Sequence, residues 1–159
     1  MAPEVLLRGP HSLAQCAAIT EDVLHEVFAQ LRTQGVALEA MLLKPNMVLA
    51  GADCPPTTAQ VADATLACLR RTVPAAMPGV AFLSGGQSPE QATRHLAAMH
   101  ARGGPLPWAL TFSFGRALHQ PALEAWGGQA ANVAAAQQVL LGQVARNWAA
   151  VGVAEGLLV

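Results

Sequence analysis

The sequence contains no tyrosine and a single lysine, Lys44, and only 12% of its 159 residues are charged. Its formal net charge is −1 at pH 7. A protein that binds nucleic acid needs a basic face, and the neighbouring Arg70 and Arg71 are too few to supply one. The composition therefore argues against a nucleic-acid partner.

Cysteine is scarce as well, and the three cysteines, Cys16, Cys54 and Cys68, form no CxxC pair. We expect them to be reduced packing residues rather than disulfides or zinc ligands. His95 and His100 are five residues apart on one predicted helix, which does not place two metal ligands on one helix face, and His11, His25 and His119 are scattered. We expect no metal and no other cofactor.

No segment approaches the roughly 18 uninterrupted apolar residues of a membrane span, and Arg8 lies where a signal peptide would be apolar. We expect a soluble, cytoplasmic protein with no membrane partner. Hydrophobic residues are abundant, at 53% of the chain, which suggests strands covered on both faces by helices. Some of this apolar surface is expected to contact a partner.

Strand, glycine-containing loop and helix recur along the chain, which predicts one α/β domain over residues 1–159 with a parallel sheet and right-handed crossovers. Helical periodicity covers residues 12 or 13 to 32, 57 or 58 to 74, 89 to about 102, 117–126 and 132–151. Short apolar runs predict strands over 40–43, ending at Lys44, over 79–83 and over 107–113.

Polar residues follow each predicted strand: Lys44, then Ser84 and Gly85, then the segment 113–116. In parallel α/β folds the carboxyl ends of the strands lie at one edge, where ligands bind. Each position also has a structural explanation, because Lys44 can extend to solvent, glycines make tight turns and an arginine can pair with a surface carboxylate. Together they offer an amine, backbone N–H groups and a guanidinium, which suit a carbonyl compound that carries phosphate.

Three segments carry a specific resemblance to class I fructose-bisphosphate aldolase. They read LLKPNM at 42–47, LSGGQS at 83–88 and WALTFSFGRAL at 108–118. The segments RRTVP at 70–74 and AWGG at 125–128 are also similar, so the resemblance extends over essentially the whole chain. It implies a partial TIM (β/α)8 barrel, made of about the last three to four βα units with C-terminal helices.

The resemblance also implies roles for individual residues. Lys44 corresponds to the Schiff-base lysine, and Glu4 to the second glutamate of a Glu-Pro-Glu segment that reads Ala-Pro-Glu at 2–4. Ala2 therefore replaces the glutamate proposed as the general acid/base, and Phe114 replaces a tyrosine. The residues implied in binding substrate phosphate are Ser84, Gly85, Ser113, Gly115 and Arg116.

Only the second half of the family's barrel has a counterpart, so an active-site aspartate, two lysines and an arginine are not matched. We expect a fragment of the glycolytic enzyme that cleaves fructose 1,6-bisphosphate to dihydroxyacetone phosphate and glyceraldehyde 3-phosphate, with impaired activity. The alternative is a non-catalytic sugar-phosphate-binding protein or an assembly remnant. Open strand edges further predict either a homo-oligomer or a missing N-terminal half as partner.

Overall fold

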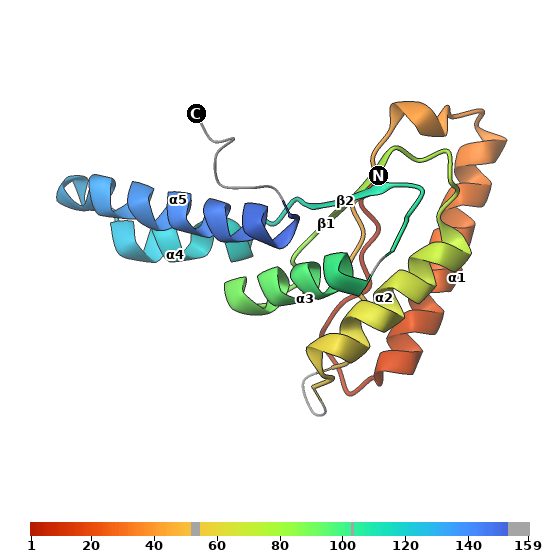
Figure 1. The fold of residues 1–159 in the computed structure, drawn as a ribbon, viewed down its shortest axis with the longest axis horizontal. Coiled ribbons are helices and arrows are strands. Elements are labelled where there is room, and N and C mark those ends of the chain that lie inside the picture. Colours follow the sequence, from red (N-terminus) through yellow and green to blue (C-terminus); the bar gives the residue numbers. More distant parts are fainter. Residues whose placement is uncertain (52–54, 103, 153–159) are drawn as a thin grey trace.

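The computed structural model describes residues 1–51, 55–102 and 104–152, in which helices surround a small parallel sheet (Figure 1). The α-helices are α1 (Leu13–Thr33), α2 (Thr58–Thr72), α3 (Pro89–Arg102), α4 (Arg116–Trp126) and α5 (Val133–Ala150). Two short 3₁₀ helices are η1 (Leu38–Ala40) and η2 (Ala130–Asn132), and the strands are β1 (Gly79–Phe82) and β2 (Ala109–Phe112).

The two strands pair in parallel, with Gly79 opposite Ala109 and Phe82 opposite Phe112. On the other side of β1, Leu43 forms a parallel bridge with Val80. Beyond that segment, Met1 donates from its amino terminus to the Leu42 carbonyl, and its own carbonyl accepts from the Lys44 N–H at 2.8 Å. Four extended segments of the chain thus lie side by side: the N-terminal residue Met1, then residues 42–44, then β1, then β2.

Capping residues explain where the first two long helices begin. The Ser12 hydroxyl accepts from the Gln15 N–H at 3.2 Å, and the Gln15 side chain accepts from the Ser12 N–H at 2.7 Å. Thr57 and Gln60 make the same reciprocal pair at the start of α2. Such capping boxes satisfy N–H groups that have no partner within the helix.

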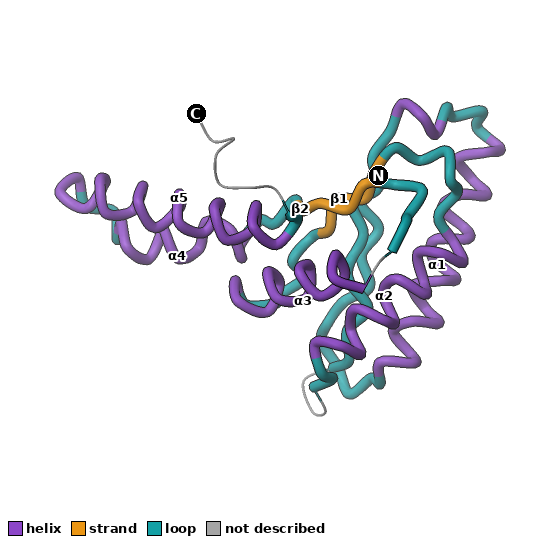
Figure 2. Tube along the Cα trace, viewed as in Figure 1, coloured by secondary structure: helices purple, strands orange, loops and turns teal. Residues whose placement is uncertain are grey.

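α1 packs against α2 and α2 against α3, and α3 contacts β2, whereas α4 and α5 lie together and extend away from α1 and α2 (Figures 1 and 2). β1 is buried along its whole length, and the core around it is made mainly of aliphatic, methionine and aromatic side chains. Cys16 and Cys68 lie in this core as free, buried thiols, while Cys54 lies outside the described residues. None of the helices in the described part of the chain is long and apolar enough to cross a bilayer.

The predicted strand over 40–43 is wrong at its start. Ala40 ends η1, because the Ala40 and Met41 N–H groups donate to the carbonyls of Ala37 and Leu38, which closes two tight turns. Only Leu43 of this run makes a bridge to the sheet. The other two strands are present but shorter than predicted, over 79–82 and 109–112.

Beyond Lys44 the chain continues as a buried segment, 46–49, in which two backbone N–H groups donate to side chains of helices. The Val48 N–H donates to Thr65 Oγ1 of α2 at 2.9 Å, and the Leu49 N–H donates to Cys16 Sγ of α1 at 3.4 Å. A buried N–H without a partner is costly, so these two polar side chains hold the segment against the helices.

Candidate active site

The polar residues that follow the strands meet at one edge of the sheet. The Leu83 N–H donates to the Pro45 carbonyl at 3.0 Å, and the Ser113 N–H donates to the Phe82 carbonyl at 2.8 Å. These bonds place the residue after Lys44 beside the residue before Ser84, and Ser113 beside the end of β1. The sequence-based expectation that the three positions converge agrees with this geometry.

Lys44 lies on 42–44, one of the two inner extended segments, between fully buried Leu43 and buried Pro45. Its side chain is half-buried. The backbone of this residue is fixed by the hydrogen bond from its N–H to the Met1 carbonyl. The amine is therefore carried on a rigid part of the backbone while its side chain still has access to solvent.

Ser84 and Gly85 begin a tight turn, residues 84–87, between β1 and α3. The Gln87 N–H closes it by donating to the Ser84 carbonyl at 3.0 Å. Gly85 has φ +56° and Gly86 has φ +86°, a region that residues with a Cβ rarely adopt. Ser84 is only 7% exposed, and Gly85 is half-buried.

Glu4 lies next to this turn. A Cβ built on Gly85 would be 3.9 Å from Glu4 Oε1, so the carboxylate is beside the glycine. The N-terminal segment is held there by Asn46, whose Oδ1 accepts from the Val5 N–H at 3.0 Å. Glu4 and Ala2 are both exposed.

The third element is the start of α4. Gly115 is its N-cap residue, and the Gly115 carbonyl accepts from the N–H groups of Leu118 and His119. Ser113 is half-buried, Phe114 is buried, and Gly115 and Arg116 are exposed. Within residues 1–51, 55–102 and 104–152, no carboxylate pairs with the Arg116 guanidinium. The N-terminus of α4 and a free guanidinium together favour an anion.

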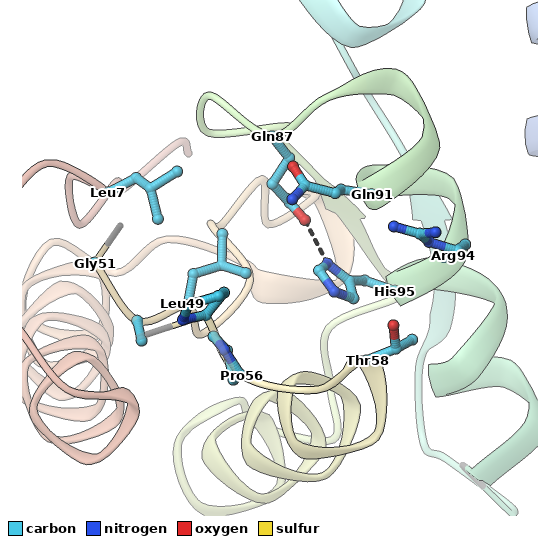
Figure 3. A pocket seen from close by; sticks show the side chains of 11 residues that line it. Leu7, Leu49, Gly51, Pro56, Thr58, Gln87, Gln91, Arg94 and His95 are labelled. Atoms are coloured by element: carbon cyan, nitrogen blue, oxygen red, sulfur yellow. Dashed lines mark hydrogen bonds between the residues drawn. The ribbon is translucent and has the colours of Figure 1, made fainter. Parts of the chain in front are cut away.

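Two residues at the site went unnoticed in the sequence, Gln87 and His95. The sequence assigns no role to Gln87, which belongs to the LSGGQS segment, and the spacing between His95 and His100 only argues against His95 as a metal ligand. In the structure both are buried, and His95 Nδ1 lies 2.6 Å from Gln87 Oε1 (Figure 3). Burial, and secondly the nearby Arg94 guanidinium, lower the pKa of His95 below its ordinary value of 6.5.

These two side chains, with Gln91 and Arg94, form one wall of a cavity of about 360 Å³ (Figure 3). Leu7, Leu49 and Pro56 line the opposite side. In the described part of the chain, no three His, Cys, Asp or Glu side chains are grouped so that they could hold a metal ion. Outside this cavity, at the sheet edge, Lys44 offers an amine, Glu4 offers a carboxylate, and the 84–87 turn and the start of α4 offer two anion-binding positions.

A family profile described as "Glycolytic: Fructose-bisphosphate aldolase class-I" matches residues 1–155. Fructose-bisphosphate aldolase of Plasmodium falciparum (isolate K1 / Thailand) is 53% identical over 147 residues, which are 91% of this chain and 40% of that protein. The cytoplasmic isozyme 1 of Pisum sativum is 51% identical over 146 residues, 91% of this chain and 41% of that protein.

A solved structure of Plasmodium falciparum fructose-bisphosphate aldolase, in complex with TRAP and a small-molecule inhibitor, superposes with a TM-score of 0.90 at 51% identity. The match covers 97% of this chain and 45% of that one. The chain thus has an aldolase-like α/β fold and spans about two-fifths of the length of the curated relatives it matches. These comparisons place the chain in the class I fructose-bisphosphate aldolase family.

Proposed function

We propose that Lys44 forms a Schiff base with the carbonyl of a ketose phosphate, as part of the aldol cleavage of fructose 1,6-bisphosphate. The observation that carries this proposal is the convergence at one sheet edge of the only lysine with the 84–87 turn and the start of α4. An amine placed beside two anion-binding positions suits a carbonyl compound that bears phosphate.

The reaction begins when the neutral Lys44 amine attacks C2 of the ketose to give a carbinolamine. Loss of water gives an iminium ion, which accepts the electron pair of the C3–C4 bond when that bond breaks. The C4 hydroxyl gives up its proton and becomes the aldehyde of glyceraldehyde 3-phosphate. Protonation of the enamine at C3 and hydrolysis then release dihydroxyacetone phosphate and regenerate the amine.

We assign the two phosphate positions to Ser84 and Gly85, and to Ser113, Gly115 and Arg116. Ser84 and Ser113 offer hydroxyl donors, the glycines allow a phosphate close to the backbone, and Arg116 supplies positive charge. Positions of this kind hold the reacting carbon against the amine, which is a large part of catalysis in reactions that need orientation.

Glu4 is the carboxylate that we assign to proton transfer, because it lies beside Gly85. Ala2, at the position where the family resemblance implies a glutamate, carries no proton-transfer group. Loss of a general acid/base typically lowers the rate by about 10² to 10⁴. We therefore expect Schiff-base formation with much slower turnover, or a sugar-phosphate binder that does not turn over.

We further propose that the four parallel segments belong to the wall of a partial (β/α)8 barrel, and that the chain forms a homo-oligomer. Among the described residues, β2 pairs on one side only, with β1. An unpaired edge exposes N–H and C=O groups that favour pairing with another chain.

The test of Schiff-base formation is borohydride trapping of the 159-residue chain with dihydroxyacetone phosphate, followed by mass spectrometry. The proposal predicts an adduct that inorganic phosphate suppresses by competition and that Lys44→Met abolishes. Stabilisation against heat by dihydroxyacetone phosphate without any adduct would favour the non-catalytic binder. Neither an adduct nor stabilisation would contradict both.

A further inference from the structure

The Gln87 side chain is 7% exposed and makes three hydrogen bonds at the 84–87 turn. Its Nε2 donates to the Ser84 carbonyl at 2.9 Å and to Met47 Sδ at 3.5 Å. Its Oε1 lies 2.6 Å from His95 Nδ1. Because the Gln87 N–H also donates to the Ser84 carbonyl, this one residue makes two bonds to the carbonyl of Ser84.

The direction of these bonds determines the tautomer of His95. Gln87 Nε2 is the donor toward Ser84, so Gln87 Oε1 is the acceptor and His95 Nδ1 must carry the hydrogen. A neutral ring then has its lone pair on Nε2. His95 is 6% exposed and sits on α3, so the bond to Gln87 connects the turn to the rigid helix that follows it (Figure 3).

The turn needs such a connection because its two glycines have wide conformational freedom. Gly85 and Gly86 both adopt positive φ, which leaves many other backbone conformations open to them. The Ser84 hydroxyl and Gly85 N–H can bind phosphate with a defined geometry only if this freedom is removed. Gln87 holds the Ser84 carbonyl, and His95 holds Gln87.

We propose that His95 and Gln87 are positioning residues that keep the 84–87 turn in its phosphate-binding conformation. The inference rests on the proposed function, since it takes Ser84 and Gly85 as the phosphate site. Neither side chain is required to touch the ketose. They act through the backbone of Ser84.

The test compares His95→Leu, which removes the donor, with His95→Asn, which keeps an N–H on the atom attached to Cγ. His100→Leu, an exposed histidine on the same helix, is the matched control. Each variant is trapped with borohydride over a range of dihydroxyacetone phosphate concentrations and, separately, of dihydroxyacetone, which has no phosphate. Hydrogen exchange at the Gln87 amide is measured on the same proteins.

A buried acceptor left without its donor is energetically unfavourable, so without the His95 N–H other conformations of the turn become more populated. We expect His95→Leu to raise the half-saturating concentration of dihydroxyacetone phosphate about tenfold, with the maximal trapping rate changed less than about twofold. Trapping of dihydroxyacetone should be unchanged, and the Gln87 amide should exchange faster. His95→Asn and His100→Leu should resemble the unmodified chain.

The proposal is overturned if His95→Leu changes the trapping of both ketoses equally or of neither. It is also overturned if His95→Asn binds dihydroxyacetone phosphate as weakly as His95→Leu does. If the unmodified chain forms no adduct, the proposed function fails, and the exchange measurement alone decides the positioning role. Faster exchange in His95→Leu but not in His95→Asn supports it, and equal exchange overturns it. If His95→Leu does not fold, Gln87→Met takes its place in the test. If neither variant folds, the two residues are needed for the stability of the whole fold, and the proposed role in positioning the turn is overturned.

Discussion

Lys44 shows how much a single residue can indicate when its neighbours are read with it. A lysine after an apolar run is normally a strand-end residue that extends to solvent. Its half-buried side chain fits that interpretation as well as a reactive one. The reactive interpretation is favoured by the residues nearby. The parallel arrangement of the strands brings Ser84, Gly85 and Arg116 to the same sheet edge as the Lys44 amine.

His95 gives a prediction about pH. Its pKa in the folded chain lies below 6.5 because burial, and then Arg94, disfavour the charged ring. In the unfolded chain the ordinary pKa returns, so below pH 6.5 the unfolded state binds a proton that the folded state does not. The stability contributed by neutral His95 is therefore fully present above pH 6.5 and falls as the pH drops toward the lower folded pKa.

The measurement is urea unfolding between pH 7.5 and about 5. The free energy of unfolding should fall over this range in the unmodified chain and fall less in His95→Asn, which has no titrating ring. His100→Asn, on the same helix but exposed, should keep the slope of the unmodified chain. Identical slopes in all three proteins would show that His95 is not responsible.

The residues that the sequence proposes for the site are those whose chemistry is visible in a short segment, such as Lys44 and Arg116, and their roles stay predictions. Gln87 and His95 are eight positions apart, and their hydrogen bond exists only because α3 packs against the turn. Nothing in their spacing indicates which ring nitrogen faces the glutamine. Their part in the site depends on tertiary structure and could not be predicted from sequence.

At the scale of elements, helices were predicted well because caps and apolar periodicity are local. The helix predicted from residue 89 to about 102 agrees with α3, which Ser88 and Gln91 cap by reciprocal hydrogen bonds. The strand over 40–43 failed at Ala40 because two tight turns continue to that residue. Strand length depends on where neighbouring segments stop, and the sequence of one strand does not contain that information.

Thr65 is a polar residue of α2 whose hydroxyl stabilises a neighbouring segment of the chain, residues 46–49, rather than α2 itself. Its hydroxyl accepts from the Val48 N–H, and Val48 is completely buried. Thr65→Val should lower the free energy of unfolding by about 1–3 kcal/mol, because it leaves that N–H without a partner. Thr72→Val is the matched control, since the Thr72 hydroxyl bonds only to the Cys68 carbonyl of its own helix.

Chemical denaturation of the two variants checks this prediction. Thr72→Val should change the free energy of unfolding by about 0.5 kcal/mol or less. Equal losses in the two variants would mean that the segment 46–49 does not depend on the Thr65 hydroxyl.

Gly51 makes a close contact with another backbone segment. A Cβ at this position would overlap the Gly9 carbonyl oxygen, so the backbone has to move if a methyl group is added. We expect Gly51→Ala to reduce the free energy of unfolding by about 1–3 kcal/mol. Gly142→Ala, in the middle of α5 with only ordinary contacts, should instead be neutral or stabilising by up to about 1 kcal/mol.

Thermal or urea unfolding of these two alanine variants measures the difference directly. A Gly51→Ala variant as stable as the unmodified chain would show that residues 9 and 51 can separate without cost.

At the scale of the whole molecule, exposed apolar side chains on α4 and α5 offer the proposed oligomer a contact surface in addition to the β2 edge. Leu123 and Trp126 of α4 are 48% and 42% exposed, and Val133 and Leu141 of α5 are 43% and 59% exposed. Sedimentation velocity at a protein concentration on the order of 10 µM should show a species larger than a monomer. The double variant Leu123→Gln, Trp126→Gln should shift it toward the monomer.

Ile19→Gln is the control, because Ile19 is also exposed, at 49%, but lies on α1. It should leave the distribution unchanged. A well-folded monomer as the main species of the unmodified chain would contradict the homo-oligomer.

The amine of Lys44 is the proposed nucleophile, and because the sequence has no other lysine, a single measurement can test it. The chain has one lysine, so the amino terminus is the only other amine that can form a Schiff base. Borohydride reduction with dihydroxyacetone phosphate, followed by peptide mapping, should find the adduct on the Lys44 peptide and none in Lys44→Arg. An adduct confined to Met1, or an equal yield from Lys44→Arg, would contradict the account.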